Sequence, residues 1–316
     1  MASGRKPGRT DTKAMSVKGL ITAMITPMKD GEIDEAGVQQ LVERLIQKGV
    51  DALFILGTNG EFHVLRREEK IRLADMVVRF ANGRVPVYAG SGGNSTQEVI
   101  ELSQDLQQTG ITALSVITPF LVPLTQTELQ QHYEAVANAV KVPIILYNIP
   151  KNTGNNIEPQ IAAALACHKN IVGIKDSSGN IEQIRQYIEA TKGMEFAVLS
   201  GSDSLILKAL QLGAKGAVAA TSNLLTDIDV AIVTLFEQGR LAEAQAMQER
   251  IEPLRKVLKL GSIPSVLKAA MNMAGISAGE CRKPVRMPDE AVSAEIRMML
   301  QQYELEGERA CLKQIS

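Results

Sequence analysis

A single lysine interrupts the apolar segment Ile171–Ser178, whose length and composition are typical of a buried strand. Moving an ammonium group out of water is unfavourable, so burial lowers the pKa of a lysine side chain. A lysine amine that is neutral near physiological pH can attack a ketone and form a Schiff base. Lys175 is therefore a candidate nucleophile, and the alternative is a structural lysine that pairs with the adjacent Asp176.

A glycine-rich segment, Gly57-Thr58-Asn59-Gly60-Glu61, follows a second apolar run. Its backbone N–H groups and the side chains of Thr58 and Asn59 could bind a carboxylate. The alternative is a tight turn in which the glycines serve only the backbone geometry.

Tyr147 lies in a third apolar run, Pro143–Pro150. A buried tyrosine needs a hydrogen-bond partner for its hydroxyl, and core packing with one such bond would be enough. Beside a reactive lysine, the same hydroxyl could transfer protons. Tyr147 is therefore a candidate acid–base residue or a core residue.

Side chains alternate along a strand, so Ile171, Gly173 and Lys175 are predicted to share one face. If that face points into a barrel, Val172 and Ile174 should contact the surrounding helices.

Eight strand-like apolar runs recur between residues 20 and 223, and amphipathic stretches with a helical period separate them. Strand–helix alternation predicts a parallel sheet, and eight continuously apolar strands predict an α/β fold, a (β/α)8 TIM barrel. An open doubly wound sheet is the alternative, but a turn rather than a glycine-rich dinucleotide loop follows the first run. The runs are Leu20–Met28, Asp51–Gly57, Val85–Ser91, Ala113–Pro119, Pro143–Pro150, Ile171–Ser178, Phe196–Asp203 and Gly216–Asn223.

After Asn223 the pattern becomes helical, with predicted helices over 227–239, 241–260, 263–274 and 289–304. The first should close a barrel formed by residues 19–239. The others should form a C-terminal helical appendage, residues 240–316, packed on the barrel. Residues 1–18 are basic and polar, and we expect a disordered arm or an extension ahead of a true start at Met15.

Composition argues against several classes of partner. The formal net charge of −1 and the absence of Trp give no basis for nucleic-acid binding. No apolar run reaches the roughly 18 residues that a membrane span needs. The three cysteines lie far apart and show neither metal-ligand nor disulfide spacing, which favours a cytoplasmic location.

Three motifs in this order resemble the dihydrodipicolinate synthase / N-acetylneuraminate lyase family of class I pyruvate-dependent aldolases. They are Gly57–Glu61, Tyr147–Pro150 and Gly173–Asp176, and the resemblance extends from about Gly19 to the C-terminal helices. It implies a (β/α)8 barrel with a C-terminal helical extension, usually assembled as a homotetramer. It also implies that Lys175 forms an imine with pyruvate while Tyr147, linked to Thr58, relays protons. No metal or organic cofactor is implied, because the lysine imine itself acts as the electron sink.

The resemblance also implies the residues that bind substrate. Thr58 and Asn59 would hold the carboxylate of pyruvate, together with the backbone of Gly57 and Gly60. The pyruvate pocket would further be lined by Gly201 and Val218.

Departures from the family pattern bear on the second substrate. Asn59 stands where the family has threonine, and Phe120 and Leu121 stand where the lysine-biosynthesis branch has two tyrosines. Asn152 replaces the arginine that grips the carboxylate of the aldehyde in that branch, and the neighbouring Lys151 lacks arginine's bidentate fork.

The sequence therefore favours a lyase that joins pyruvate to a hydroxylated aldehyde or cleaves a 2-keto-3-deoxy sugar acid, with Asn152 and Thr153 lining the acceptor pocket. The first alternative is a 4-hydroxy-tetrahydrodipicolinate synthase that condenses pyruvate with aspartate semialdehyde. A remoter one is a barrel that binds a keto acid without turnover. A metal-dependent class II aldolase is disfavoured because His63, His132 and His168 are scattered.

Overall fold

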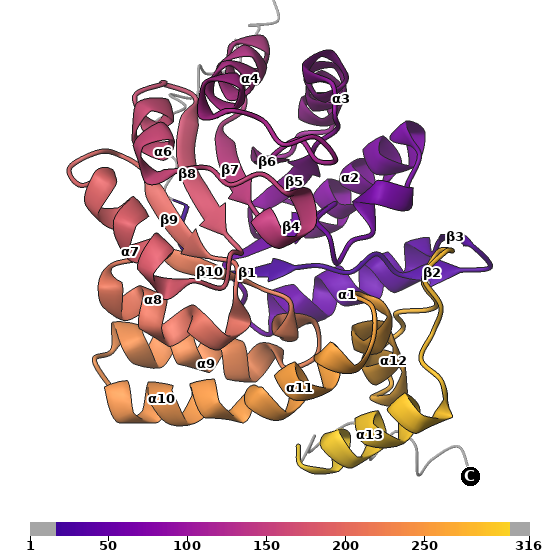
Figure 1. Cartoon of the computed structure of the whole chain (residues 1–316). Coiled ribbons are helices and arrows are strands. Elements are labelled where there is room, and N and C mark those ends of the chain that lie inside the picture. Colours follow the sequence, from indigo (N-terminus) through magenta and orange to yellow (C-terminus); the bar gives the residue numbers. More distant parts are fainter. Residues whose placement is uncertain (1–16, 304–316) are drawn as a thin grey trace, which may run out of the picture.

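Eight parallel strands close into a barrel in the computed structural model, which describes residues 17–303 (Figure 1). Consecutive barrel strands pair with each other, and β1 pairs with β10 to close the ring. The predicted TIM barrel is thus confirmed, with one barrel strand for each apolar run; β1 begins one residue before its run, at Gly19. The strands are β1 (Gly19–Ala23), β4 (Ala52–Ile55), β5 (Val87–Ser91), β6 (Ala113–Ile117), β7 (Ile144–Asn148), β8 (Ile171–Asp176), β9 (Ala197–Ser200) and β10 (Gly216–Ala219).

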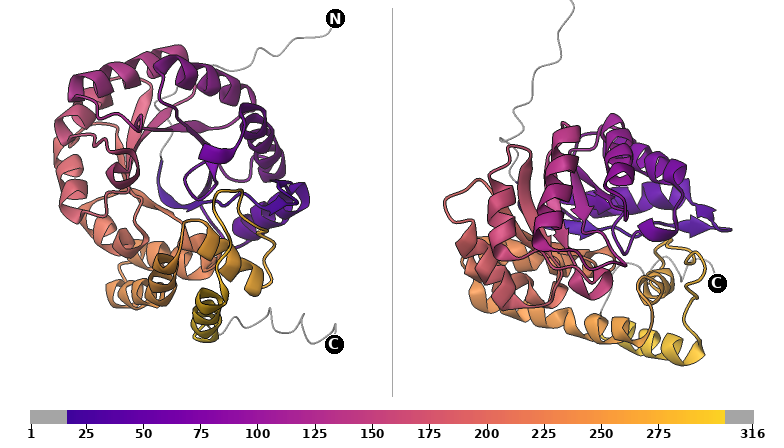
Figure 2. Two further views of the ribbon diagram at one scale, coloured as in Figure 1. Left: turned by 45° about the vertical axis from the view of Figure 1, so that its right-hand side comes forward. Right: turned by 45° about the horizontal axis from the view of Figure 1, so that its top comes forward.

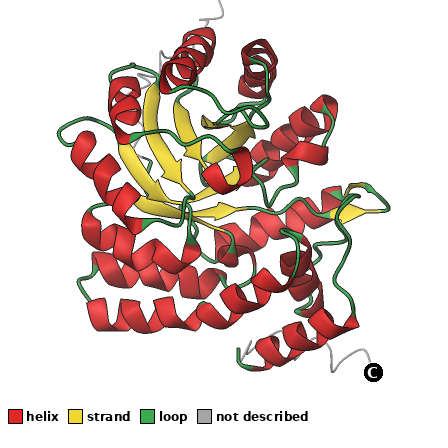
Figure 3. Cartoon of the chain, viewed as in Figure 1, coloured by secondary structure: helices red, strands yellow, loops and turns green. Residues whose placement is uncertain are grey.

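Helices form the outer layer of the barrel, as the left view of Figure 2 and the colours of Figure 3 show. No helix in residues 17–303 is long and apolar enough to cross a bilayer. The short helices α5 (Pro150–Thr153) and α6 (Pro159–Ala166) were not predicted, because at four and eight residues they offer little periodicity to detect. The helices of this layer are α1 (Glu35–Gln47), α2 (Arg67–Ala81), α3 (Thr96–Gln108), α4 (Gln126–Ala139), α6 (Pro159–Ala166), α7 (Ile181–Ala190), α8 (Ile206–Leu212) and α9 (Thr226–Glu237), while α5 directly follows the carboxyl end of β7.

Smaller elements fill the connections between strands and helices. The first apolar run was predicted as one strand over Leu20–Met28. In the structure the strand β1 ends at Ala23, and the chain then continues into a two-stranded hairpin. The hairpin and the 3-10 turns are β2 (Met28–Lys29), β3 (Glu32–Ile33), η2 (Phe62–Val64), η3 (Asp203–Leu205), η4 (Thr221–Asn223) and η5 (Leu258–Leu260).

The C-terminal segment begins with a helix that is divided rather than continuous. The predicted helix over 241–260 is split at Ile251 into α10 (Leu241–Arg250) and α11 (Glu252–Val257). Pro253 lies in the first turn of α11, where its missing N–H leaves no bond unmade, whereas inside a continuous helix it would remove one.

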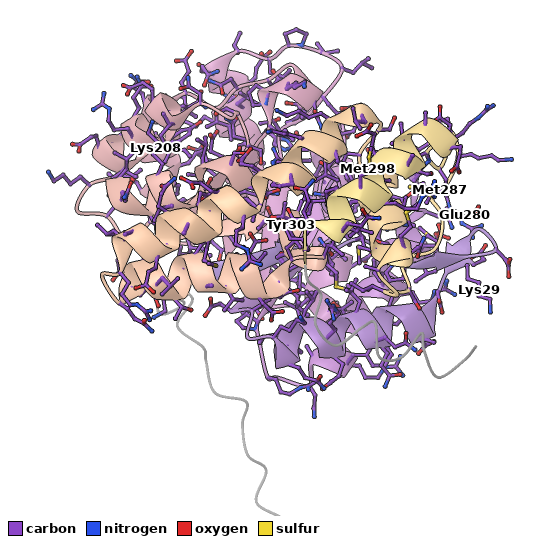
Figure 4. The ribbon with its side chains drawn as sticks, turned by 90° about the horizontal axis from the view of Figure 1, so that it is seen from below. Lys29, Lys208, Glu280, Met287, Met298 and Tyr303 are labelled. Carbon is purple, nitrogen blue, oxygen red and sulfur yellow. The ribbon has the colours of Figure 1, made fainter. Side chains whose placement is uncertain are left out.

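Two further helices, α12 (Ser265–Met273) and α13 (Glu290–Gln301), complete the C-terminal segment. Tyr303 lies where α13 meets α10 and α11 (Figure 4), and its hydroxyl donates to the Arg250 carbonyl at 2.8 Å. This bond ties the end of the described chain to the first C-terminal helix.

Apolar side chains fill the barrel and also the layer between strands and helices. Val17, assigned to the arm from the sequence, is only 2% exposed and belongs to the inner cluster; residues 1–16 of that arm and residues 304–316 lie outside the described part. The inner cluster comprises Val17, Ile21, Ala23, Ala52, Phe54, Tyr88, Ala113, Ile145, Val172, Ala197, Leu199 and Val218.

The prediction that Val172 contacts the surrounding helices is wrong. The pairing of β7 with β8 shifts after Ile144, so that Ile144 faces Ile171 and Ile145 faces Gly173. A bulge of this kind breaks the alternation of side chains. As a result Val172 packs in the inner cluster, while Ile174 packs in the outer one as expected.

A buried ion pair ties the glycine-rich loop to the C-terminal segment. Lys268 Nζ lies 2.5 Å from Glu61 Oε1, and the two side chains are 0% and 1% exposed. Lys268 also donates to the Glu280 carbonyl, and the Arg282 backbone N–H donates to Glu61. The pair therefore joins the loop at Glu61 to two parts of the C-terminal segment, at Lys268 and at residues 280–282.

We expect Lys268→Met to lower the free energy of unfolding by about 3–5 kcal/mol, because it leaves Glu61 as an unpaired buried charge. Glu61→Gln should be destabilising for the same reason. The double variant should lose clearly less than the sum, because neither group then remains unpaired. Urea unfolding of the three variants measures this, and additive losses would contradict the coupling.

Candidate active site

A cavity of about 340 Å³ opens at the carboxyl ends of the barrel strands. TIM-barrel strands place catalytic groups at this end, because the loops that follow them converge there. Seven of the ten site residues predicted from the sequence line the cavity: Thr58, Asn59, Tyr147, Asn152, Lys175, Gly201 and Val218.

Lys175 is buried at the inner end of this cavity and is 4% exposed. Its Nζ lies 3.9 Å from the centre of the Tyr147 ring and 4.5 Å from the centre of the Phe54 ring. Burial lowers the pKa of Lys175, while the neighbouring Tyr147 and Asp203 act in the opposite direction. The amine is therefore held where its neutral, nucleophilic form is favoured relative to a lysine in water.

Asp176, the next residue of β8, points to the opposite face of the strand from Lys175 and forms its hydrogen bonds there. Its carboxylate accepts from Asn148 Nδ2 at 2.9 Å and from Ser178 Oγ at 2.6 Å. Gln183 of α7 also reaches it, at 3.4 Å. The alternative in which Lys175 is a structural partner of Asp176 is therefore wrong.

Tyr147 lies directly beside Lys175, because the two residues pair in register on β7 and β8. Its hydroxyl is 3.3 Å from Thr58 Oγ1, and either oxygen can be the donor. Its ring packs edge-on against Phe54 at a centroid distance of 6.2 Å. A hydroxyl so placed, with a second hydroxyl in reach, can pass protons to and from a group bound on Lys175.

In the loop from Gly57 to Gly60, the two central residues and the two glycines have different roles. Thr58 and Asn59 line the cavity, whereas Gly57 and Gly60 do not. A Cβ on Gly57 would lie 2.7 Å from the Phe54 ring, and one on Gly60 would lie 3.1 Å from a backbone nitrogen. The two glycines thus permit close packing, while their two neighbours can contact a bound anion.

Gly201 and Val218 border the amine from the next two strands. A Cβ on Gly201 would lie 3.0 Å from Lys175 Cε and 2.1 Å from Ser177 Oγ, so a larger residue would displace the lysine or its neighbour. Val218 belongs to the inner cluster and also lines the cavity floor. Both residues therefore define the space available next to Lys175.

The outer part of the cavity differs from the prediction at Thr153. Asn152 is exposed and lines the cavity, as does Lys151. Thr153 is instead 5% exposed and away from the cavity, and its Oγ1 accepts from Thr118 Oγ1 at 2.9 Å. Its hydroxyl is used within the protein, because α5 turns it toward the end of β6.

The three histidines lie outside the cavity. His63 is exposed, His132 is bonded to Thr96, and His168 is bonded to Asn138. Within residues 17–303, no group of three or more His, Cys, Asp or Glu side chains is arranged to hold a metal ion.

Two charged residues that sequence reasoning did not select also line the cavity. Asp203, at the start of η3, is 2% exposed, and burial raises its pKa. Arg255 of α11 bonds to it, with Nη1 3.1 Å from Asp203 Oδ2. Asp203 is the last residue of the predicted run Phe196–Asp203, and a carboxylate at a strand end is a signal that could have been used. Arg255 offered none, because 52 residues separate it from its partner.

A parallel barrel with a shielded lysine beside a tyrosine at its carboxyl end is the architecture of a class I pyruvate-dependent aldolase. Comparison with known proteins gives the family. Residues 16–303 match the Dihydrodipicolinate synthetase family. The chain belongs to this family.

Individual relatives agree with that assignment. The 4-hydroxy-tetrahydrodipicolinate synthase of Syntrophus aciditrophicus is 38% identical over 290 residues, which cover 92% of this chain and 99% of the relative. The dihydrodipicolinate synthase structure from Aquifex aeolicus has a TM-score of 0.88 at 33% identity, covering 92% and 99% of the two chains. The chloride-inhibited enzyme from Acinetobacter baumannii, complexed with pyruvate, has a TM-score of 0.87 at 34% identity, covering 90% and 98%.

Proposed function

We propose that this chain condenses pyruvate with aspartate semialdehyde through an imine on Lys175, as a 4-hydroxy-tetrahydrodipicolinate synthase. The observation that carries the chemistry is the Lys175 amine, buried in the cavity at 3.9 Å from the Tyr147 ring centre. The choice of acceptor is supported by the names of the relatives, which reverses the preference for a sugar-acid substrate drawn from the sequence.

The first half of the reaction uses the inner cavity. The Lys175 amine attacks C2 of pyruvate, and the carbinolamine loses water to give an imine. Tyr147, with Thr58 at 3.3 Å, supplies the proton that the departing hydroxide needs. Thr58 and Asn59 hold the carboxylate of pyruvate, since both side chains line the cavity next to the lysine.

The second half uses the outer cavity. Tyr147, which has given its proton to the departing hydroxide, accepts a methyl proton and so converts the imine into an enamine, whose carbon attacks the aldehyde of the acceptor. Tyr147 returns a proton to the new alkoxide, and water then hydrolyses the imine and frees Lys175. The lysine imine serves as the electron sink, so the scheme needs neither a metal nor an organic cofactor.

A second candidate function is cleavage or synthesis of a 2-keto-3-deoxy sugar acid. The observation that favours it is Asn152, which lines the outer cavity where the lysine-biosynthesis branch is expected to carry arginine. An amide can bond to hydroxyl groups of a sugar-like acceptor, but it has no charge for a carboxylate.

Acceptor assays distinguish the two candidates. With pyruvate fixed, we expect kcat/KM for aspartate semialdehyde to exceed that for glyceraldehyde by at least about 10-fold, because a charged group is recognised in addition to the aldehyde. Pyruvate consumption, with product mass as identification, measures this. Faster turnover of glyceraldehyde would favour the sugar-acid reaction instead.

We also propose assembly as a homotetramer in the cytoplasm. Leu121 and Val122, after β6, are 85% and 60% exposed, and such apolar side chains favour burial against another subunit. Native mass spectrometry should show a species of four chains, and a monomer at micromolar concentration would contradict the proposal.

A further inference from the structure

Two cations from distant parts of the chain line the outer cavity. Lys151 comes from α5 and is exposed, while Arg255 comes from α11 in the C-terminal segment. Among the described residues that line the cavity, Asp203 is the single acid, and its side chain is 3% exposed. The surface that faces a bound acceptor is therefore positively charged.

Two hydrogen bonds hold the guanidinium of Arg255 and leave part of its donors free. Its Nε donates to Ser204 Oγ at 3.3 Å, and its Nη1 donates to Asp203 Oδ2 at 3.1 Å. Asp203 is itself fixed by the Ala220 backbone N–H, which donates to Oδ1 at 2.9 Å. These bonds fix the orientation of the guanidinium plane.

Three of the five N–H donors of Arg255 remain after these two bonds, one on Nη1 and two on Nη2. The Nη1–Nη2 edge has the spacing that binds both oxygens of a carboxylate. Arg255 lines the cavity and its side chain is 24% exposed, so a bound group can reach the side chain while the bond to Asp203 stays in place.

We propose that Arg255 binds a carboxylate at the far end of the acceptor aldehyde, and that Lys151 adds a weaker attraction to the same group. The proposal rests on the proposed function and specifies its acceptor as an aldehyde with a distal acid. It also gives a physical account of Asn152: the arginine that this position of α5 lacks is supplied instead by α11, since Asn152 and Arg255 line the same cavity.

A purely structural role for Arg255 makes a different prediction. The bond to Asp203 joins α11 to η3, so an uncharged replacement could loosen that junction and impair every step equally. A binding role requires instead that the loss depend on the acid of the acceptor. The test therefore compares two acceptors that differ only in that group.

The acceptors are succinic semialdehyde and butanal, which share a four-carbon chain and differ in the distal carboxylate. We expect the wild type to prefer the acid. Arg255→Gln should lower kcat/KM for succinic semialdehyde by about 10–100-fold, because a charge-assisted bidentate contact is lost, and should change that for butanal less than about 2-fold. For succinic semialdehyde, kcat/KM of Arg255→Lys should lie between the values of the wild type and of Arg255→Gln, because lysine keeps the charge but lacks the two parallel N–H donors of arginine.

Matched variants define the background. Lys256→Gln removes an exposed cation from the same helix, outside the cavity, and should leave both acceptors unchanged. Lys151→Gln should lower kcat/KM for succinic semialdehyde by about 2–5-fold, because an exposed charge contributes less. Equal losses for both acceptors in Arg255→Gln would overturn the proposal in favour of the structural role.

Exchange of the pyruvate methyl hydrogens with deuterium from the solvent separates the two proposals, because it needs the imine but no acceptor. We expect Arg255→Gln to exchange at the wild-type rate. If the wild type exchanges normally but does not prefer succinic semialdehyde over butanal, the proposed role of Arg255 is overturned while the proposed function stands. Absence of exchange in the wild type would overturn the proposed function and this inference with it.

Discussion

Lys175→Met is expected to abolish turnover, with a loss on the order of 10⁴–10⁶-fold in kcat, because the variant retains the cavity but has no amine to attack pyruvate. Borohydride reduction in the presence of pyruvate should trap an adduct on Lys175 in the wild type and none in the variant. Peptide mass spectrometry locates the adduct. The matched control is Lys208→Met, which removes an exposed lysine of α8 (Figure 4) and should leave activity unchanged.

An adduct on any other lysine, or normal activity in Lys175→Met, would contradict the proposed nucleophile. A second readout guards against a variant that merely fails to fold. Burial lowers the pKa of Lys175 below 10.5, so the folded state binds its proton less tightly than the unfolded chain does. The wild type is therefore destabilised below the folded-state pKa, and this penalty disappears as the pH rises toward the unfolded-state value.

Methionine carries no such penalty, so Lys175→Met should unfold at an equal or higher temperature than the wild type at neutral pH. The difference should shrink as the pH is raised toward 10.5. Thermal unfolding between pH 7 and pH 10 measures it. A difference that grows with pH would mean that the pKa of the buried amine is raised, not lowered.

Tyr147→Phe has the second-largest expected effect, a loss of about 10²–10⁴-fold in kcat, because the ring stays in place while the proton-transferring hydroxyl is removed. Imine formation with pyruvate should slow as well, since loss of water from the carbinolamine also needs a proton. Exchange of the pyruvate methyl hydrogens with deuterium from the solvent needs the imine but no acceptor. Its rate therefore reports on imine formation separately from condensation.

Tyr88→Phe is the matched control, because Tyr88 is also buried in the inner cluster, at 3% exposure, but does not line the cavity. It should retain activity within a few-fold. Comparable losses in the two variants would show that the hydroxyls matter for packing in the barrel and not for proton transfer. Thr58→Val should show a smaller loss than Tyr147→Phe, since Thr58 acts through the tyrosine hydroxyl at 3.3 Å.

Much of the fold followed from the alternation of apolar runs and amphipathic stretches. Helix α3, Thr96–Gln108, occupies the amphipathic stretch between the third and fourth apolar runs, where the serine and threonine at its start and the glycine after its end mark both limits locally. The division between α10 and α11 was missed although Pro253 is visible, because proline in a first turn and proline inside a helix look alike without the flanking contacts.

The candidate site was less completely predicted than the fold. Strand ends identify which residues reach the carboxyl rim, so Thr58, Tyr147 and Lys175 could be grouped before any contact was known. They do not tell which way a residue turns after the strand has ended. Thr153 therefore proved to be buried against Thr118 instead of facing the cavity.

The sequence by itself determined that a lysine would sit in an apolar strand of a closed barrel, since local composition and periodicity specify both. Only the tertiary structure decided which groups surround it. Phe54 and Tyr147 contact the amine, Asp176 turns away, and Arg255 arrives from a helix that the barrel pattern does not include. The physical reason is that side-chain alternation is a property of neighbouring residues, whereas the contents of a cavity depend on how distant segments pack.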